Sequence, residues 1–366
     1  MRRLDPRREQ LTAIGRTRVG GIRVFLLSAL AERRTLGLGR RMMKVPRRCL
    51  LHLATGAALT VASRSVWADS YPAHPVRIVV GFAAGSTSDI LARLIGQWLS
   101  ERLGQQFVVE NRPGAGGNVG AETVVRAAPD GYTLLLVPPA VAANTALYQD
   151  LNFNFMRDAA PVAGVVRVPN VVEVNPGMPV KTVPELITYA KANPGALSFA
   201  SAGIGTISHL AGQLFNTATG INLQHVPYRG DGPAMADLIA GQVQVGFGTM
   251  TASIGHIRAD KLRPLAVTTL SRSTALPGIP SVSEFVPGYE ASSWFGIAAP
   301  RGTPVEIIQI LNREINAGLA DPRIEARLTD MGGMLLTGSP ADFGKLIADE
   351  TEKWGKVIKL AGIKAE

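Results

Sequence analysis

The hydrophobic positions between residues 76 and 99 change their spacing half-way along this stretch. The first seven residues, VRIVVGF, are mostly apolar, as in a buried strand, and the later apolar residues recur every three or four positions, as on one face of a helix. The small residues AAGSTS lie between them, and Ser86 and Asp89 have the S-x-x-D spacing of a capping box. The pattern therefore predicts a strand, a short loop and a capped helix.

The start of such a helix is a candidate anion site. Its first N–H groups lack partners inside the helix, and the helix macrodipole places roughly half a positive charge there. Glycine and alanine in the loop would let a ligand come close to the backbone. An ordinary capped helix has the same features, so a functional interpretation needs a second element of this kind.

A second stretch repeats this layout further along the chain. Residues 196–200 predict a strand, residues 201–206 a loop of small residues, and the following residues a helix that Thr206 caps and Gly220 ends. Two such helix ends facing each other across a cleft would offer two sets of N–H donors. That arrangement suits a ligand with a carboxylate at one or both ends.

Strand-like and helix-like segments alternate through the rest of the chain, which predicts α/β lobes with mainly parallel sheets. About 297 residues after the first 69 exceed one average domain, and the apolar runs 161–174 and 291–298 could cross between two lobes. We therefore expect an N-terminal extension over 1–68, lobe 1 over 69–171 and 294–366, and lobe 2 over 172–293.

The glycine-rich segment 111–120, NRPGAGGNVG, is a possible nucleotide loop. Gly114, Gly116 and Val119 miss the G-x-G-x-x-G pattern at its last position, and no G-K-S/T follows. A turn with close backbone packing is the favoured interpretation.

The net charge of +10 is distributed unevenly along the chain. Of 38 basic and 28 acidic residues, the first 69 positions hold 15 and 4, which leaves 23 and 24 from residue 70 onward. The body of the protein is therefore near neutral, which argues against a nucleic-acid partner.

The basic front end has the layout of an export signal. Arg47 and Arg48 precede the apolar run 50–62, and Ala68 ends a small-x-small cleavage site, so we expect cleavage near Ala68 and a periplasmic protein. Sec export fits better than twin-arginine export, and Met42 or Met43 is a more natural start than Met1. The single cysteine, Cys49, precedes the apolar run, so the mature chain has no thiol chemistry.

Seven segments spread in order over the mature chain resemble solute receptors of the tripartite tricarboxylate transporter family, also called the Bug family. They are YPAHPVRIVVGFAAGSTSD from Tyr71, VVENRPGAGGNVGAETV from Val108, PDGYTLLL from Pro129, SFASAGIGTISHLAGQLF from Ser198, VPYRGDGPAMADLIAGQV from Val226, RPLAVTT from Arg263 and SSWFGIAAPRGTP from Ser292. The resemblance implies a periplasmic-binding-protein fold of type II, with two α/β lobes joined by two crossing strands. It also implies a small organic acid as ligand and an inner-membrane permease as partner. We expect no cofactor or metal, and a monomer.

The resemblance places the ligand-contacting loops on residues 82–89 and 201–209. The residues it implies in the first loop are Phe82, Ala83, Gly85, Ser86, Thr87 and Asp89, and those in the second are Ser201, Gly203, Ile204, Gly205, Thr206 and His209. N–H groups of Gly85, Ser86 and Thr87 would hold one carboxylate, partly through water, and residues 203–206 would hold the distal end. Asp89 would cap its helix and order water.

Further side chains are implied with less definite roles. Tyr228, Phe247 and Trp294 are expected as side walls of the cleft. His209 would either donate to the ligand or cap its helix, and Arg229 would either pair with a carboxylate or lie solvated on a loop.

The chain departs from the family pattern in three respects. The family tends to have proline where Gly81 and Ala84 stand, a second glycine where Ser86 stands, and often aspartate where Gln244 stands. Because the site is built largely from backbone groups, the identity of the acid does not transfer across these changes.

Two other functions compete with this interpretation. A serine hydrolase needs a G-x-S-x-G elbow, and the residues around Ser201, FASAG, lack its first glycine. The histidines after residue 69 have no metal-binding spacing, so we expect no enzyme. An exported sensor that signals without transport stays open, because docking surfaces have no readable motif.

Overall fold

The computed structural model describes residues 71–148, 151–360 and 362–364. The predicted extension, the signal peptide and its cleavage near Ala68 lie outside the described residues. No helix in the described part of the chain is long and apolar enough to cross a membrane.

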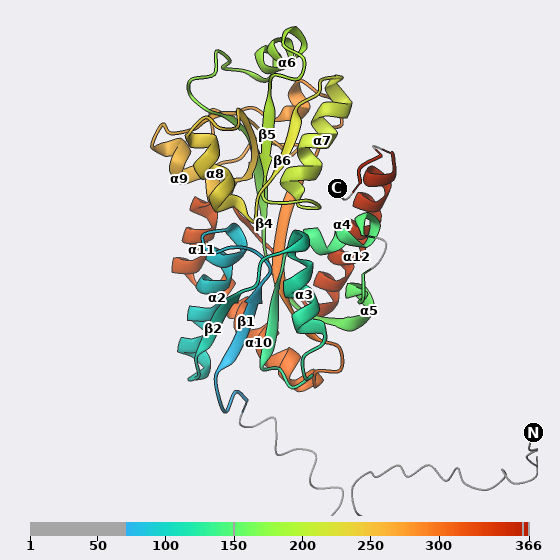
Figure 1. The fold of residues 1–366 in the computed structure, drawn as a ribbon. Coiled ribbons are helices and arrows are strands. Elements are labelled where there is room, and N and C mark those ends of the chain that lie inside the picture. The colour runs from blue at the N-terminus through green and yellow to red at the C-terminus, as the bar shows by residue number, and fades with distance from the viewer. Residues whose placement is uncertain (1–70, 149–150, 361, 365–366) are drawn as a thin grey trace, which may run out of the picture. The chain divides into compact units, whose positions relative to one another are not determined.

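Strands and helices alternate as the sequence pattern predicts (Figure 1). The strands are β1 (Val76–Val80), β2 (Phe107–Asn111), β3 (Thr133–Val137), β4 (Ala159–Val174), β5 (Ser198–Ser201), β6 (Gln224–Pro227), β7 (Val245–Thr249), β8 (Arg263–Val267), β9 (Ser292–Pro300) and β10 (Met334–Leu335). The helices are α2 (Thr87–Leu103), η2 (Ala115–Gly117), α3 (Asn118–Val125), α4 (Ala140–Leu147), α5 (Phe155–Asp158), α6 (Val183–Ala192), α7 (Ile207–Thr219), α8 (Asp231–Ile239), α9 (Met250–Arg258), η3 (Val282–Glu284), α10 (Val305–Leu319), α11 (Pro322–Asp330) and α12 (Pro340–Leu360).

The strands form one mixed sheet in the order β2-β1-β3-β9-β4-β7-β5-β6, with β8 and β10 also paired to β4. Strands β1, β2 and β3 are parallel to one another, and so are β5, β6 and β7. We name the part around β1–β3 lobe 1 and the part around β5–β7 lobe 2. The long strands β4 and β9 run antiparallel to their neighbours.

Strand β4 carries the chain from lobe 1 into lobe 2. Its residues 159–169 pair with β9, and its residues 170–174 pair with β7. Strand β9 begins at this same crossing and runs back into lobe 1, where it also pairs with β3. The two crossing strands are therefore neighbours, and both loops predicted to bind ligand lie near them.

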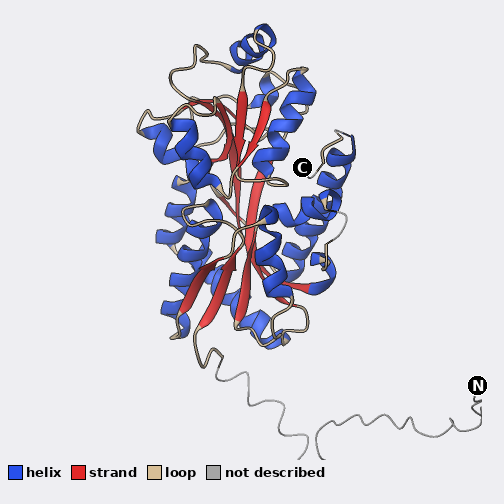
Figure 2. Ribbon diagram, viewed as in Figure 1, coloured by secondary structure: helices blue, strands red, loops and turns tan. Residues whose placement is uncertain are grey.

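The lobe 1 sheet is covered by helices on both faces (Figure 2). Ile78 and Leu134 pack in the cluster that contains α2 and α10 residues, whereas Val79 and Leu135 pack in the cluster that contains α3, α4 and α12 residues. Successive side chains of a strand point to opposite faces, so burial on both faces explains why β1 and β3 are continuous apolar runs.

Helix α12 packs with residues of both lobes. Phe343 belongs to the lobe 1 cluster around Val79, whereas Trp354 belongs to the cluster that contains Phe199 of lobe 2. Arg167 of β4 donates to Glu350 Oε1 at 3.1 Å, and Trp354 Nε1 donates to Glu350 Oε2 at 2.9 Å. The C-terminal helix thus packs along α4 and the crossing strand β4, and Lys353 pairs with Glu290 just before β9. The exact lobe boundaries stay a prediction.

Candidate functional site

The two strand–loop–helix units predicted from the sequence are both present. Strand β1 leads into α2, whose N-cap Ser86 accepts a hydrogen bond on Oγ from Asp89 N at 3.3 Å. Strand β5 leads into α7, whose N-cap Thr206 accepts on Oγ1 from His209 N at 3.4 Å. Both cap residues have extended backbone angles, as an N-cap requires.

The first loop of lobe 1 lies directly against lobe 2. Ala83 N donates to the carbonyl oxygen of Arg229 at 3.1 Å, and Thr87 N donates to Asp231 Oδ2 at 3.4 Å. The hydroxyl groups of Thr87 and Thr249 also hydrogen-bond. The structure therefore shows the lobes closed on each other, with α8 and α9 of lobe 2 beginning next to the start of α2.

The three N–H groups expected to hold a carboxylate already have acceptors within the chain. Gly85 N donates to Asp89 Oδ2 at 3.0 Å, Ser86 N to the carbonyl of Ala83 at 3.2 Å, and Thr87 N to Asp231. A helix start at a closed interface needs acceptors for its N–H groups, and here the loop and lobe 2 supply them. Direct binding of a carboxylate by all three would need these bonds to open.

Asp89 orders the first loop. Its carboxylate accepts from Arg93 through Nε at 3.0 Å and Nη2 at 2.9 Å, from Asn111 Nδ2 at 3.0 Å, and from Gly85 N. Burial opposes its ionisation, but these hydrogen bonds prevail and lower the pKa of Asp89. Asp89 thus caps and braces the loop through the protein's own groups.

The second loop is held by its own side chains and by a histidine pair. Ser201 Oγ lies 2.6 Å from His225 Nε2, and Gly203 N donates to that same Oγ at 3.1 Å. His209 accepts from Gly205 N through Nδ1 at 3.2 Å, and its ring stacks on His225 at a centroid distance of 4.1 Å. Burial lowers the pKa of His209 to about 4 and that of His225 to about 3. His209 thus braces its own loop in this structure, and its donation to a ligand stays a prediction.

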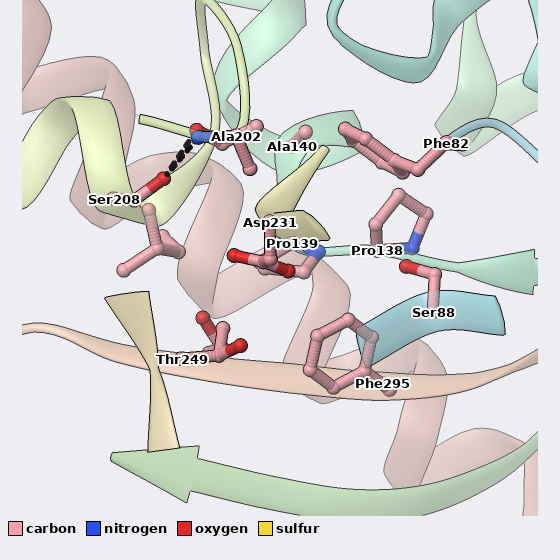
Figure 3. A pocket seen from close by; sticks show the side chains of 13 residues that line it. Phe82, Ser88, Pro138, Pro139, Ala140, Ala202, Ser208, Asp231, Thr249 and Phe295 are labelled. Carbon is pink, nitrogen blue, oxygen red and sulfur yellow. Dashed lines mark hydrogen bonds between the residues drawn. The ribbon is translucent and has the colours of Figure 1, made fainter. Parts of the chain in front are cut away.

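Two cavities adjoin at the meeting of the lobes. The inner cavity, of about 30 Å³, lies between the lobes (Figure 3). It is lined from lobe 1 by Phe82, Ser88, Pro138, Pro139 and Ala140, from the crossing strand β9 by Ser293 and Phe295, and from lobe 2 by Ala202, Thr206, Ile207, Ser208, Asp231 and Thr249. The outer cavity, of about 210 Å³, is lined by Gly81, Phe82, residues 114–117, Tyr148, residues 202–204 and residues 227–229. Phe82 and Ala202 line both cavities, so these two residues mark where the cavities adjoin.

The glycine-rich loop expected to be a plain turn lines the outer cavity. Residues 114–117 all have positive φ, and a Cβ on Gly116 would lie 2.3 Å from the carbonyl oxygen of Ile204 in lobe 2. Glycine is therefore required there for the lobes to meet. The sequence signal was available: this loop follows β2, and ligands of α/β sheets bind beyond the carboxyl ends of parallel strands.

The expected wall residues divide into two groups. Tyr228 lines the outer cavity, and its hydroxyl donates to Asp237 Oδ2 at 2.7 Å. Arg229 lines the same cavity with an exposed side chain. Phe247 and Trp294 line neither cavity, which corrects their expected position as side walls.

The reason for this correction is packing. Phe247 is fully buried between Phe199 and Phe215, each at a ring distance of 5.6 Å. Trp294 is buried against Phe343, and its neighbour Phe295 faces the inner cavity, because successive residues of a strand point to opposite faces.

The groups around the inner cavity can bind a polar ligand through hydrogen bonds. Ser88, Thr206 and Ser208 bring hydroxyl groups to the inner cavity, and the N-termini of α2 and α7 approach it from different lobes. No group of three or more His, Cys, Asp or Glu residues within the described ranges is placed to hold a metal ion.

The model of the tripartite tricarboxylate transporter family receptor matches residues 91–363. The chain belongs to this receptor family. Among the relatives of this receptor, protein BugT of Bordetella pertussis is 37% identical over 302 residues, which are 82% of this chain and 93% of BugT.

Solved structures of similar proteins share the fold of the receptor. Rpa4515 of R. palustris, whose structure contains adipate, is 40% identical with a TM-score of 0.79, and the match covers 80% of this chain and 99% of that one. MatC of Rhodopseudomonas palustris, with bound malate, is 31% identical with a TM-score of 0.76, covering 79% and 100%. The predicted family and the predicted two-lobed periplasmic-binding-protein fold are both confirmed.

Proposed function

We propose that this receptor binds a small organic acid between its two lobes and delivers it to the inner-membrane permease of a tripartite tricarboxylate transporter. The observation that carries the proposal is that α2 of lobe 1 and α7 of lobe 2 begin at one cavity. Structures of two relatives with adipate and malate support a carboxylate as the recognised group.

The binding chemistry follows from the start of α7. The first-turn N–H groups of Ile207 and Ser208 have no acceptor within the helix, and both residues line the inner cavity. Ser88 of α2 faces them from lobe 1. A carboxylate in this cavity would accept N–H and hydroxyl hydrogen bonds and lie at the positive ends of two helix dipoles.

The rest of a ligand fits the outer cavity. About 210 Å³ accommodates a short carbon chain, and Arg229 and Tyr228 bring polar groups to its wall. Binding first to one lobe, followed by hinge closure of the other, would enclose the acid and form the surface that the permease recognises.

The cellular setting is part of the proposal. The export signal expected before residue 69 would place the receptor in the periplasm, and membership of a receptor family supports a binding role without turnover. We therefore expect no hydrolysis of a panel of esters and amides by the purified protein.

Thermal-shift measurements test the proposal directly. The mature receptor is screened against mono-, di- and tricarboxylates, aromatic acids, amino acids and the corresponding amides. Ligand at a hundredfold excess over Kd stabilises the native state by about 2.7 kcal/mol, so a shift of several degrees is expected with one class of acids and none with its amides. Absence of any shift, in protein shown by mass spectrometry to carry no co-purified ligand, would contradict the proposal.

A further inference from the structure

Asp231 is a buried carboxylate in the wall of the inner cavity. It is the first residue of α8, its exposed fraction is 5%, and Figure 3 shows its side chain among the lining residues beside Thr249. The preceding residue, Gly230, has a φ of 131° and lies close to Ala83 and Ser86 of the first loop. This close approach holds Asp231 against the start of α2.

The partners of Asp231 leave part of its hydrogen-bonding capacity unused. It accepts from Thr87 N at 3.4 Å, a long contact. The side chain of Thr87 and the side-chain and backbone groups of Thr249 lie close enough to favour its ionised form, although burial still raises the pKa of Asp231. The two threonine hydroxyl groups also hydrogen-bond to each other, so one of their two protons is used in that bond and is not available to Asp231. A carboxylate has about four acceptor positions, and three donors at most are then directed at Asp231.

The charge of Asp231 is not balanced by a cation. Among the described residues, no lysine, arginine or histidine forms an ion pair with it. Glu173 of β4 is also fully buried, and burial raises its pKa to about 8, so it brings no compensating charge to Asp231. A buried carboxylate in this position favours a ligand that brings a hydrogen-bond donor and disfavours one that brings only negative charge.

We propose that Asp231 determines specificity by selecting acids that carry a hydroxyl or amino group next to the bound carboxylate over acids with a bare carbon chain. This inference rests on the proposed function. Ile207, Ser208 and Asp231 line the same cavity of about 30 Å³, so a carboxylate bound at the start of α7 would have its neighbouring carbon close to Asp231. The substituent on that carbon donates to the free acceptor position of Asp231.

Calorimetric titration of matched acids tests this inference. The mature receptor is titrated at pH 7.5 with four series, each with constant chain length: propionate, lactate and alanine; succinate, malate and aspartate; glutarate, 2-hydroxyglutarate and glutamate; adipate and 2-aminoadipate. In the series that binds best, we expect the hydroxy or amino acid to bind about tenfold or more tightly than the bare acid, as for a charged hydrogen bond.

The variant D231N keeps the shape of the side chain and removes its charge. We expect this variant to bind the bare acid nearly as well as the substituted acid, within about threefold. The control D349N removes an exposed carboxylate of α12 outside both cavities and should keep the wild-type preference. Circular dichroism establishes whether each variant is folded. If D231N does not fold, the preference of the wild type for substituted over bare acids still tests the inference.

Four results overturn the inference. They are binding of bare acids by the wild type that equals or exceeds that of substituted acids, an unchanged preference in D231N, a loss of preference in D349N, and tighter binding of bare acids at low pH in the wild type but not in D231N. The last would make Asp231 a protonated donor to the ligand. Binding of bare acids alone contradicts this inference and leaves the proposed function intact, whereas binding of no acid contradicts the proposed function itself.

Discussion

Single glycines set how closely the two lobes approach each other. A Cβ on Gly116 would lie 2.3 Å from the carbonyl oxygen of Ile204, and a Cβ on Gly205 would lie 2.2 Å from Asn144 Oδ1. In both places a residue of one lobe meets the backbone or a buried side chain of the other. A single methyl group at either position is therefore enough to hold the cleft open.

The substitution G116A tests this steric limit. It should weaken acid binding roughly tenfold or more, because overpacking costs about 1–3 kcal/mol and here opposes closure. Small-angle scattering should show a larger radius of gyration for the variant with saturating ligand than for the wild type.

The control for this prediction is G195A. Gly195 has a φ of 77°, similar to the 61° of Gly116, but a Cβ there meets no atom within 4 Å. Both variants should lose about 1 kcal/mol of unfolding free energy from backbone strain. Equal effects of the two variants on binding would refute a steric role for Gly116.

At the residue scale, the sequence predicted the features that depend on residues next to each other in the chain. It did not predict the features that depend on contacts between distant segments. The caps at Ser86 and Thr206 follow from local spacing, and both are present. The wall positions of Phe247 and Trp294 required knowledge of which strand face packs under a helix. The role of Gly116 required knowledge of the opposite lobe.

The crossing of β4 and β9 depends on one buried asparagine. Asn170 Nδ2 donates to the carbonyl of Phe247 on β7 at 2.8 Å, and its Oδ1 accepts from Ser293 of β9 at 2.9 Å. Its backbone N donates to Thr268 Oγ1 at 3.0 Å. One side chain thus ties together the strands at the point where the chain passes between lobes.

The variant N170A should lower the free energy of unfolding by about 2–3 kcal/mol. It removes two buried hydrogen bonds and leaves a carbonyl and a hydroxyl without partners. Urea denaturation measures the change, with an unchanged slope if the folded state stays compact. The partly exposed Asn193, which donates to the carbonyl of Tyr189, provides a control, since N193A should cost less than about 1 kcal/mol. A similar cost for both variants would count against a special role for Asn170.

The order of elements was predictable because alternation and capping are strong local signals, and the long run over residues 161–174 suggested a crossing strand. The pairing of β4 with β9 along most of its length was not predictable, because register depends on contacts between distant segments. For the same reason the sequence did not predict that α12 packs along β4 and α4.

The stability of the whole molecule should depend on pH through the buried His209 and Glu173 and the half-buried His225. Burial lowers the pKa of His209 and His225 from 6.5 to about 4 and about 3, and burial raises the pKa of Glu173 from 4.5 to about 8. Below pH 6.5 the two histidines become protonated in the unfolded chain but stay neutral in the folded protein, so the free energy of unfolding falls as the pH falls. Between pH 4.5 and 8 folded Glu173 keeps a proton that the unfolded chain releases, so stability falls as pH rises.

These opposing effects predict a maximum of stability near pH 6.5. Below that pH, the two histidines together take up more protons on unfolding than Glu173 releases, so their effect is the larger one. Urea unfolding at pH 5, 6.5 and 8 measures it. The variant E173Q stays neutral throughout and should lose the decline between pH 6.5 and 8. A decline that persists unchanged in E173Q would show that another group causes it.

The path of α12 also gives the molecule an optical signal. Its first half packs on lobe 1, while the fully buried indole of Trp354 lies in a cluster with lobe 2 residues. Rotation of one lobe against the other would change the surroundings of this indole and therefore its fluorescence emission. We therefore expect part of the intrinsic tryptophan fluorescence to follow cleft opening, which would make the kinetics of closure accessible in a stopped-flow instrument without any attached dye.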